Sequence, residues 1–322
     1  MDLNEPLVSV LTFPYNKNSY AIESIENLQK QTYKNIEHII IDDNSKDDTV
    51  TMIQDWIDKH SYTCHFIVHE QNKGLCATFN EAIKLSKGKY ITFLSDDLWT
   101  ENRLADAVRI MEEMPANVQV YFSNIEQFDE NFEFKKKSFT DCLHDNGYSE
   151  TQQLDIQLNT YKIIDKKTIQ DLLFYVNPIF APTLLIEKSI FDKIGMYDEQ
   201  LFFEDYDFYF RASEVSDFCY HNSYNVFYRL SNAGISFNSR MLIEESILKL
   251  LDKHKNKIKT STQQRAHNKN KTNTATSLLA LYAQQKNWEK YKEITIKHLL
   301  PNYAITKFST KKLLRSLWNW IS

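Results

Sequence analysis

The sequence has few residues of the kinds that mark flexible, cross-linked or membrane-spanning proteins. Its 322 residues include only five glycines and six prolines, which leaves little room for flexible linkers. Its four cysteines are far apart and form no CxxC pair, which disfavours a disulfide framework or a zinc site and favours a reducing compartment. No run approaches the ~18 uninterrupted apolar residues of a membrane span, and MDLNEPLVSV lacks the apolar segment of a secretion signal. We therefore expect a folded cytoplasmic protein.

Charge is distributed unevenly along the chain. The formal net charge is -5, yet residues 241–322 carry 16 Lys and Arg against 5 Asp and Glu, whereas residues 1–240 carry 22 against 38. This asymmetry predicts two bodies, a domain over 1–240 and a basic helical region over 241–322. The basic region suits nucleic acid or an anionic membrane surface, whereas the acidic body needs a cation in order to approach an anionic ligand.

The first hundred residues alternate between β-type and α-type segments. We predict strands at 6–13, 36–43, 64–70 and 89–94, and helices at 20–31, 47–60 and 80–88. Alternation with short connections indicates a parallel sheet with helices on both faces, on which ligands bind beyond the carboxyl ends of the strands. Asp42, Asp43, Asp96 and Asp97 all follow such ends.

The remainder of the chain is less regular, and we assign no structure to residues 140–170. The other predictions are a hairpin over 118–139, a strand and helix over 182–195, a helix over 204–215 with an acidic first turn, and a strand over 225–230. Helices separated by a polar stretch follow from residue 241.

Asp96 and Asp97 end an apolar run as two adjacent carboxylates. Both can stay ionised in a closed site only if a cation or hydrogen-bond donors offset their repulsion. Mg²⁺ and Mn²⁺ prefer oxygen ligands and are commonly held by one or two carboxylates, with water and substrate phosphates completing the shell. The alternative is that the pair caps the helix predicted over 99–114.

Four blocks of sequence resemble, in order, those of the inverting glycosyltransferases of family 2. They are VSVLTFPYNK, NLQKQTYKNIEHIIIDDNSKDDT, NKGLCATFNEAIKLSKGKYITFLSDD and IGMYDEQLFFEDYDFYFRA. The resemblance covers residues 7 to about 236. It implies an α/β protein of GT-A fold, a Rossmann-like mixed sheet flanked by helices, with a nucleotide-binding half over about 1–105, an acceptor half over about 106–240 and a C-terminal helical extension.

The same resemblance implies a reaction and its partners. A sugar would move from a nucleoside diphosphate donor, with UDP-sugars as the first candidates, to the hydroxyl of a saccharide or lipid-linked acceptor, with inversion at the anomeric carbon. The pathway would be the biosynthesis of a surface glycan of the capsule, O-antigen or lipopolysaccharide type. The cofactor would be a divalent cation, Mn²⁺ or Mg²⁺.

Residue roles follow from the matching blocks. Tyr15, with Phe13 in the same block, would lie against the nucleobase. Asp43 would accept a hydrogen bond from an imide N–H, which uracil and thymine both offer and adenine and cytosine lack. Asp96 would bind a ribose hydroxyl, and Asp97 would ligate the metal that bridges the diphosphate. Asp42 is expected to form an Asx-type turn.

The EDYD sequence supplies the predicted catalytic residues. One carboxylate must take the proton of the attacking hydroxyl, and Asp205 is the predicted general base. Glu204 would orient the acceptor or hold Asp205, and Asp207 is expected to be an ordinary acidic residue of the first helical turn. The alternative is that Glu204 and Asp205 are also only first-turn residues that favour the helix dipole.

Two departures from the family pattern keep a second function open. Phe79 replaces a common arginine, so Lys73 would supply the positive charge near the donor, and Ser231 replaces a frequent histidine. These changes allow a catalytically inactive nucleotide-sugar-binding scaffold in a glycan-assembly complex. A nucleotidyltransferase fits less well because its glycine-rich phosphate loop is missing.

The C-terminal sequence FSTKKLLRSLWNWIS alternates basic residues with leucine and tryptophan. Residues 309–322 therefore predict an amphipathic helix that either contacts an anionic membrane, peripherally on its cytoplasmic face, or packs on the catalytic body or a twin subunit. A homo-oligomer is thus left open. Nucleic acid is not an expected partner, because no segment resembles an RRM, KH or helix-turn-helix module.

Overall fold

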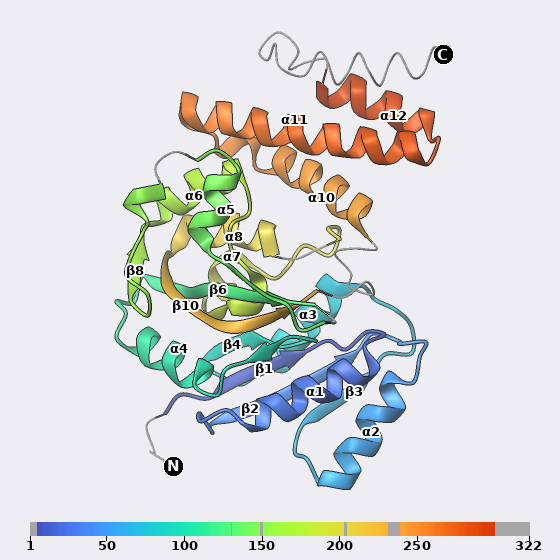
Figure 1. Ribbon diagram of the computed structural model, residues 1–322, viewed down its shortest axis with the longest axis vertical. Coiled ribbons are helices and arrows are strands. Elements are labelled where there is room, and N and C mark those ends of the chain that lie inside the picture. Colours follow the sequence, from blue (N-terminus) through green and yellow to red (C-terminus); the bar gives the residue numbers. More distant parts are fainter. Residues whose placement is uncertain (1–4, 130, 149–150, 203–204, 231–238, 300–322) are drawn as a thin grey trace. The chain divides into compact units, whose positions relative to one another are not determined.

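The computed structural model describes residues 5–129, 131–148, 151–202, 205–230 and 239–299 (Figure 1). The chain forms two compact units. The first comprises residues 1–173 and 177–232, and the second comprises residues 174–176 and 233–322.

A mixed β-sheet is the centre of the first unit. Its strands are β1 (Val8–Thr12), β2 (Ile36–Asp42), β3 (His65–Val68), β4 (Tyr90–Phe93), β5 (Leu98–Trp99), β6 (Val118–Phe128), β7 (Phe134–Lys137), β8 (Tyr161–Ile164), β9 (Leu185–Glu187) and β10 (Asp217–Arg229). The order is β3-β2-β1-β4-β9-β6-β10-β5, with β7 paired to β6 and β8 paired to β10. The first four strands in this order are parallel, whereas β9 is antiparallel to both of its neighbours. The expected mixed α/β sheet is confirmed.

Helices alternate with the strands along the chain. They are α1 (Asn18–Gln29), α2 (Thr49–His60), α3 (Leu75–Leu85), α4 (Arg103–Glu112), α5 (Phe139–Asp145), α6 (Lys166–Tyr175), α7 (Ile190–Ile194), α8 (Asp205–Val215), α10 (Arg240–Lys253), α11 (Ser261–Gln284) and α12 (Trp288–Ile294). In the first half, the predicted β-α-β-α-β-α-β order is confirmed. The helix predicted to begin at residue 80 begins earlier, at Leu75.

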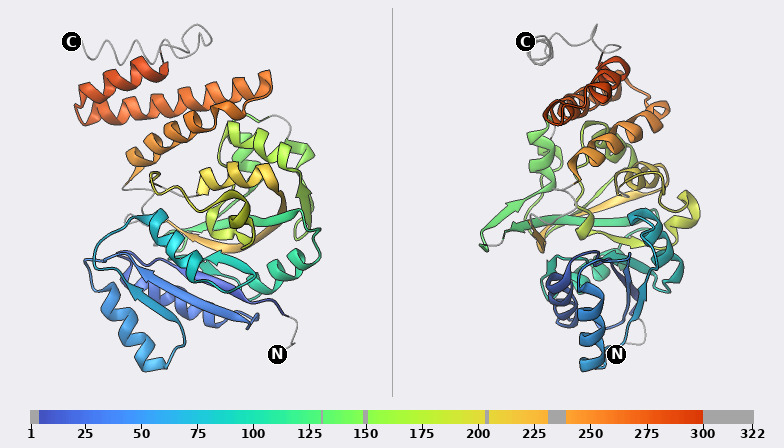
Figure 2. Two further views of the ribbon diagram at one scale, coloured as in Figure 1. Left: turned by 180° about the vertical axis from the view of Figure 1, so that it is seen from behind. Right: turned by 90° about the vertical axis from the view of Figure 1, so that its right-hand side faces the viewer.

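Both faces of β2 are covered, as its unbroken apolar sequence requires. Ile40 packs with Ile25 of α1 and Ile53 of α2, and these two helices lie side by side in Figures 1 and 2. Ile39 and Ile41 point to the opposite face and are also fully buried. The sheet is therefore held rigidly beneath the loops that follow its strands.

Gly88 permits the close approach of the chain to β1 before β4 begins. A Cβ atom at this position would lie 2.6 Å from the Ser9 amide nitrogen and 2.8 Å from the Leu7 carbonyl oxygen. The Gly88 N–H donates to Ser9 Oγ at 2.9 Å. Because no larger residue fits, this glycine fixes where β4 enters the sheet.

The segment that the sequence left unassigned contains nearly all of α5, all of β8 and the first half of α6. Ser138 and Asp141 form a reciprocal capping box that starts α5, and β8 pairs with the first half of β10. Strand β10 begins at Asp217, well before the strand predicted over 225–230. Residue 130, in the turn of the predicted hairpin, lies outside the described residues.

Three helices form the core of the second unit, where α11 runs beside α10 and α12 (Figures 1 and 2). Leu248, Leu278, Leu279, Tyr282 and Ile294 are among the side chains buried between them. Thr260 and Gln263 form a capping box at the start of α11. Within the described residues, no helix is long and apolar enough to cross a bilayer. The helix predicted over 309–322 lies outside this part of the chain.

Candidate functional site

The carboxyl ends of three parallel strands bring the predicted donor-binding residues to one edge of the sheet. β1 lies between β2 and β4 and pairs with both in parallel. Tyr15 follows β1, Asp43 follows β2, and Asp96 and Asp97 follow β4. Such an edge is where open α/β sheets bind their ligands.

The loops after β1 and β2 are joined by hydrogen bonds. Asn16, which has a positive φ of 50°, accepts from the Lys46 N–H at 2.8 Å, and its own N–H donates to Ser45 Oγ at 2.9 Å. Asp42 accepts from the Ser45 N–H at 2.7 Å, a local side-chain-to-backbone bond that spans one residue more than the Asx turn expected at Asp42. The half-buried Tyr15 is thus carried on a loop of fixed shape.

Asp43 is buried and accepts hydrogen bonds from the loop that precedes α3. Its Oδ1 accepts from the Lys73 N–H at 2.8 Å and lies 2.7 Å from His69 Nδ1, while its Oδ2 accepts from the Gly74 N–H at 2.8 Å. Gly74 has φ 88° and ψ 156°, a conformation that essentially only glycine adopts. An ionised carboxylate has about four acceptor positions, so these three contacts leave one on Oδ2.

Asp96 and Asp97 are held differently, although they are adjacent. Lys17 Nζ lies 2.5 Å from Asp96 Oδ2, and the Arg229 N–H donates to Asp97 Oδ1 at 2.9 Å. Burial, followed by the charge of Asp96, raises the pKa of Asp97 to about 8, against the opposing effects of the Arg229 amide and Lys17. Helix α4 is instead preceded by Asn102, so the alternative that this pair caps the helix is wrong.

The aspartate pair fits a divalent cation. Asp97 is buried, and among the described residues its carboxyl group accepts a hydrogen bond from the Arg229 amide and forms no ion pair. Its raised pKa shows that the protein balances the ionised form of Asp97 incompletely. No cluster of three or more His, Cys, Asp or Glu ligands occurs among the described residues. A sparse carboxylate pair completed by substrate phosphates is nevertheless the usual protein contribution for Mg²⁺ or Mn²⁺.

Arg229 connects the aspartate pair to helix α1 and strand β6. Its Nε donates to the Asp96 carbonyl at 2.9 Å and its Nη2 to Glu23 Oε2 at 2.6 Å. Its guanidinium lies over the rings of Tyr20 and Phe128, at 4.4 and 4.6 Å. Sequence reasoning missed Arg229 as a site residue, although the YR pair at the end of the last predicted strand was the available signal.

Asp205 begins α8 and is fixed by two hydrogen bonds. Asn177 Nδ2 donates to its Oδ2 at 2.9 Å, and the Tyr206 N–H donates to its Oδ1 at 2.7 Å. Burial raises the pKa of Asp205 to about 6 although both hydrogen bonds lower it. Among the described residues, no hydrogen bond or ion pair joins Asp205 to Asp43 or Asp97. Its neighbour Glu204 lies outside the described residues.

Two other predicted residues have local partners. Phe13 is only 7% exposed and stacks on Phe79, with the ring centroids 4.1 Å apart. Lys73 pairs through Nζ with Glu81 at 2.7 Å, and its side chain is 41% exposed. The Phe79 position is thus part of an aromatic core, whereas Lys73 remains at the surface.

Asp207 pairs with Arg211 one helical turn later, at 2.7 Å, which agrees with an ordinary structural acid.

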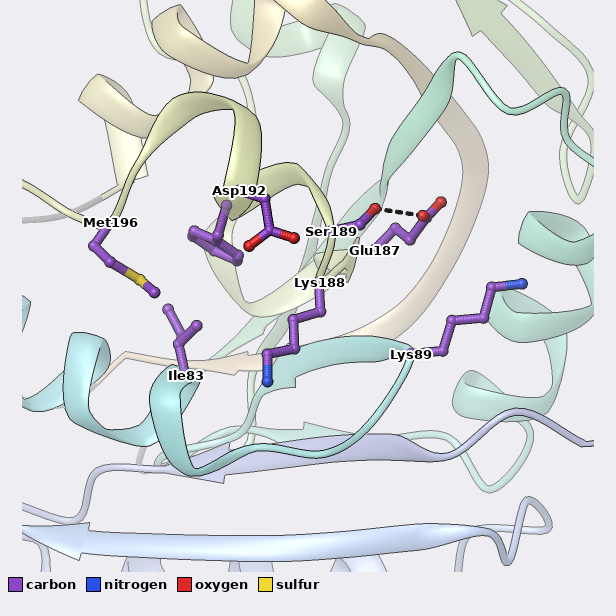
Figure 3. Close-up of a pocket in the computed structure, with 8 residues that line it drawn as sticks. Ile83, Lys89, Glu187, Lys188, Ser189, Asp192 and Met196 are labelled. Atoms are coloured by element: carbon purple, nitrogen blue, oxygen red, sulfur yellow. Dashed lines mark hydrogen bonds between the residues drawn. The ribbon is translucent and has the colours of Figure 1, made fainter.

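A separate pocket of about 380 Å³ lies near the opposite end of β4 (Figure 3). Its lining is Ile83, Lys89, Glu187, Lys188, Ser189, Phe191, Asp192 and Met196. Lys89 directly precedes β4, whereas Asp96 and Asp97 follow it. None of the predicted site residues lines this pocket, so the candidate site remains at the carboxyl edge.

Comparison with known proteins gives a consistent result. Residues 9–195 match the family model described as glycosyl transferase family 2. An uncharacterised glycosyltransferase of Rickettsia prowazekii is 30% identical over 246 residues, which cover 76% of this chain and 70% of the relative. An Escherichia coli protein named as a UDP-Glc:alpha-D-GlcNAc-diphosphoundecaprenol beta-1,3-glucosyltransferase is 38% identical over 118 residues, which cover 36% of this chain and 44% of that protein.

A solved structure has a similar fold over most of the chain. It is the mannosyltransferase of Pyrobaculum calidifontis in complex with GDP-Man and Mn²⁺. The TM-score is 0.58 at 14% identity, and the match covers 98% of this chain and 88% of that one.

Proposed function

The chain belongs to glycosyl transferase family 2 and has the GT-A fold, and from this premise we propose which reaction it catalyses. It transfers a sugar from a nucleoside diphosphate donor, a UDP-sugar as first candidate, to a hydroxyl of a saccharide or lipid-linked acceptor. The anomeric configuration is inverted, and the product belongs to a bacterial-type surface glycan.

The observation that carries this proposal is the aspartate pair at the carboxyl edge. Asp97 is buried and forms no ion pair with any residue that the structure describes, while Asp96 is paired with Lys17. A divalent cation together with a diphosphate would complete such a site. Asp97 would hold the cation, and Asp96 a ribose hydroxyl of the donor.

The surroundings of Asp43 support uracil as the nucleobase of the donor. The open acceptor position on Oδ2 suits the ring N–H next to a carbonyl of a nucleobase. Uracil, thymine and guanine each offer such an N–H. The E. coli relative is named for UDP-Glc, whereas the Pyrobaculum structure contains GDP-Man. UDP is therefore preferred, and dTDP and GDP are the alternatives to test. Tyr15 would stack on the base, with Lys73 near the phosphates and Phe13 supporting the loop from below.

Asp205 is the proposed general base. As the acceptor oxygen attacks the anomeric carbon, its proton moves to the Asp205 carboxylate and the bond from that carbon to the diphosphate oxygen breaks on the opposite face. Asn177 and the Tyr206 N–H fix the carboxylate orientation. A pKa near 6 leaves Asp205 ionised at neutral pH yet basic enough to accept the proton. A bound cation would act as a Lewis acid toward the leaving diphosphate. Glu204 keeps its proposed role of orienting the acceptor.

A nucleotide-release assay tests the proposal. UDP-, dTDP- and GDP-sugars are each incubated with the protein in Mn²⁺, in Mg²⁺ and in excess EDTA, and the free nucleotide diphosphate is measured. We expect release from UDP-sugars that requires the metal and is lost in Asp97→Ala, and a smaller loss of donor affinity in Asp96→Ala. Undiminished release in EDTA would remove the metal from the proposal, and release from none of the donors would favour a binding scaffold.

A further inference from the structure

His69 is a buried side chain that lies between two carboxylates. Its Nδ1 lies 2.7 Å from Asp43 Oδ1, and its Nε2 lies 3.2 Å from Glu81 Oε2. The side chain of His69 is only 3% exposed. A neutral imidazole has one N–H donor, whereas an imidazolium has two. A ring with both protons therefore serves both carboxylates at once, and a neutral ring serves only one.

The backbone of His69 is fixed to the end of β2. The His69 N–H donates to the Asp42 carbonyl at 2.9 Å, which continues the parallel pairing of β2 with β3. The His69 carbonyl accepts from Asn44 Nδ2 at 3.1 Å. The sheet itself thus places the ring beside Asp43, which directly follows β2.

Glu81 holds the other side of the ring. It belongs to α3, and its Oε2 also accepts from Lys73 Nζ at 2.7 Å. This hydrogen bond lowers the pKa of Glu81 against its partial burial, and the charges of Lys73 and His69 add to the lowering. Glu81 is therefore ionised at neutral pH and attracts a ring N–H. A chain of contacts thus runs from Lys73 through Glu81 to the ring that faces Asp43.

His69 completes the set of donors around Asp43 Oδ1. That oxygen accepts from the Lys73 N–H and faces His69 Nδ1, whereas Oδ2 accepts from the Gly74 N–H. Each carboxylate oxygen has two acceptor positions, so Oδ1 is filled and the open position is on Oδ2. Without the His69 contact, Oδ1 would also have an open position, and the carboxylate would turn more freely about χ2. The His69 contact therefore fixes the direction in which the open position points.

We propose that His69 is a positioning residue for nucleobase recognition, which it serves by holding Asp43 with a single open acceptor position. This role of His69 rests on the proposed binding of the donor base by Asp43. A single fixed acceptor suits the imide N–H of uracil and repels cytosine, whose ring nitrogen at that place has a lone pair and no proton. A carboxylate that turns freely would discriminate less, because it would accept from the amine of cytosine instead. His69 thus sets specificity between bases through Asp43, without contact with the ligand.

Two substitutions separate the contact with Asp43 from the packing of the ring. Asn places an N–H donor near the position of His69 Nδ1, whereas Gln reaches the position of Nε2 beside Glu81. His69→Gln is the test variant, and His69→Asn is the conservative variant that keeps the donor to Asp43. The control is His65→Gln, which makes the same change at an exposed position of β3. Calorimetric titration of the full chain measures the affinities for UDP, CDP and inorganic pyrophosphate, each with Mn²⁺.

The unmodified chain and the His65→Gln control should bind UDP more tightly than CDP. In His69→Gln, this preference should fall about tenfold, the effect of one hydrogen bond to a charged group, while the affinity for pyrophosphate changes by less than about twofold. His69→Asn should keep most of the preference. Equal losses of affinity for all three ligands in His69→Gln would indicate a purely structural role and overturn the proposal. So would a loss of preference in His69→Asn as large as that in His69→Gln.

Melting temperatures show whether each variant is folded. If His69→Gln does not fold, Glu81→Ala takes its place, because it frees the ring on its partly exposed side and should lower the same preference by a smaller factor. An unchanged preference in the folded variant would overturn the role of His69 and leave that of Asp43 intact. No preference for UDP over CDP in the unmodified chain would instead overturn the role of Asp43, and the role of His69 with it.

Discussion

Asp97 and Asp205 are both carboxylates that burial makes harder to ionise. Each has a native pKa above its unfolded value, so the native state binds more protons than the unfolded state between those two pH values. Stability therefore falls as pH rises through that window, from about 4 to about 8 for Asp97. At neutral pH, Asp97 of the ligand-free protein is therefore mostly protonated, keeping it so costs stability, and a bound cation would favour its ionised form.

Asp97→Asn should consequently stabilise the ligand-free protein while removing its response to metal. The amide oxygen can still accept from the Arg229 N–H, and the carboxyl group that folding must keep protonated is gone. We expect a gain in the free energy of unfolding of up to about 5 kcal/mol at pH 7.5, which falls below about 1 kcal/mol near pH 4. Thermal melts across this pH range measure it. Mn²⁺ with UDP should raise the melting temperature of the unmodified chain but not of the variant, and a destabilised Asp97→Asn would refute this account.

Asn177 should lower the pKa of the proposed general base, because its hydrogen bond favours the ionised form of Asp205. In Asn177→Ala, the acidic limb of the pH–rate profile should move upward by about one pH unit from its position near 6, since a hydrogen bond to a charged group is lost. Asn256→Ala, at an exposed turn, serves as the control. A purely structural role would lower the rate at every pH without moving the limb.

At the scale of elements, the loop that leads into α3 positions Asp43 by its backbone. Gly74 supplies the N–H that binds Asp43 Oδ2, and it does so in a conformation that other residues avoid. Gly195, which ends α7, also has a positive φ, of 76°, and neither glycine has any atom within 4 Å of where a Cβ would lie. A substitution is therefore strained at both glycines, whereas only Gly74 contacts Asp43.

Comparison of Gly74→Ala with Gly195→Ala separates strain from function. Both variants should lose about 1–3 kcal/mol of stability, because alanine is strained in these conformations. Only Gly74→Ala should also weaken donor binding, since the shifted amide no longer orients Asp43. Calorimetric titration with UDP below the melting temperature measures this difference. Equal donor affinities in the two variants would show that the Gly74 amide does not organise the nucleotide site.

Elements with a regular pattern were predictable, and those set by distant partners were not. The strands ending at Thr12, Asp42 and Phe93 follow from apolar runs between turn residues. Strand β8 pairs with β10 across more than fifty residues, and β5 has only two residues, so neither has a local signal. The predicted aspartates reached one edge because parallel strands end together. Their partners Lys17 and Arg229 were missed, because each contact is fixed only by the folded sheet, and the YR pair was the one local signal that pointed to Arg229.

At the scale of the whole molecule, we propose that donor binding and proton transfer belong to separate groups. The edge formed by β1, β2 and β4 holds Asp43, Asp96 and Asp97, and α8 supplies Asp205. A binding scaffold would need only the first set, whereas a transferase needs both. The central claim is therefore that removing the charge of Asp205 stops transfer without disturbing the donor site.

Parallel measurement of donor affinity and single-turnover transfer in Asp205→Asn tests this claim most directly. Asn keeps the size of the side chain and removes the base, so UDP-sugar affinity in Mn²⁺ should stay close to that of the unmodified chain, while the transfer rate falls about 10²- to 10⁴-fold. Asp192→Asn, which removes an exposed acid on α7, is the control and should change neither quantity. Transfer at a normal rate by Asp205→Asn would contradict the account.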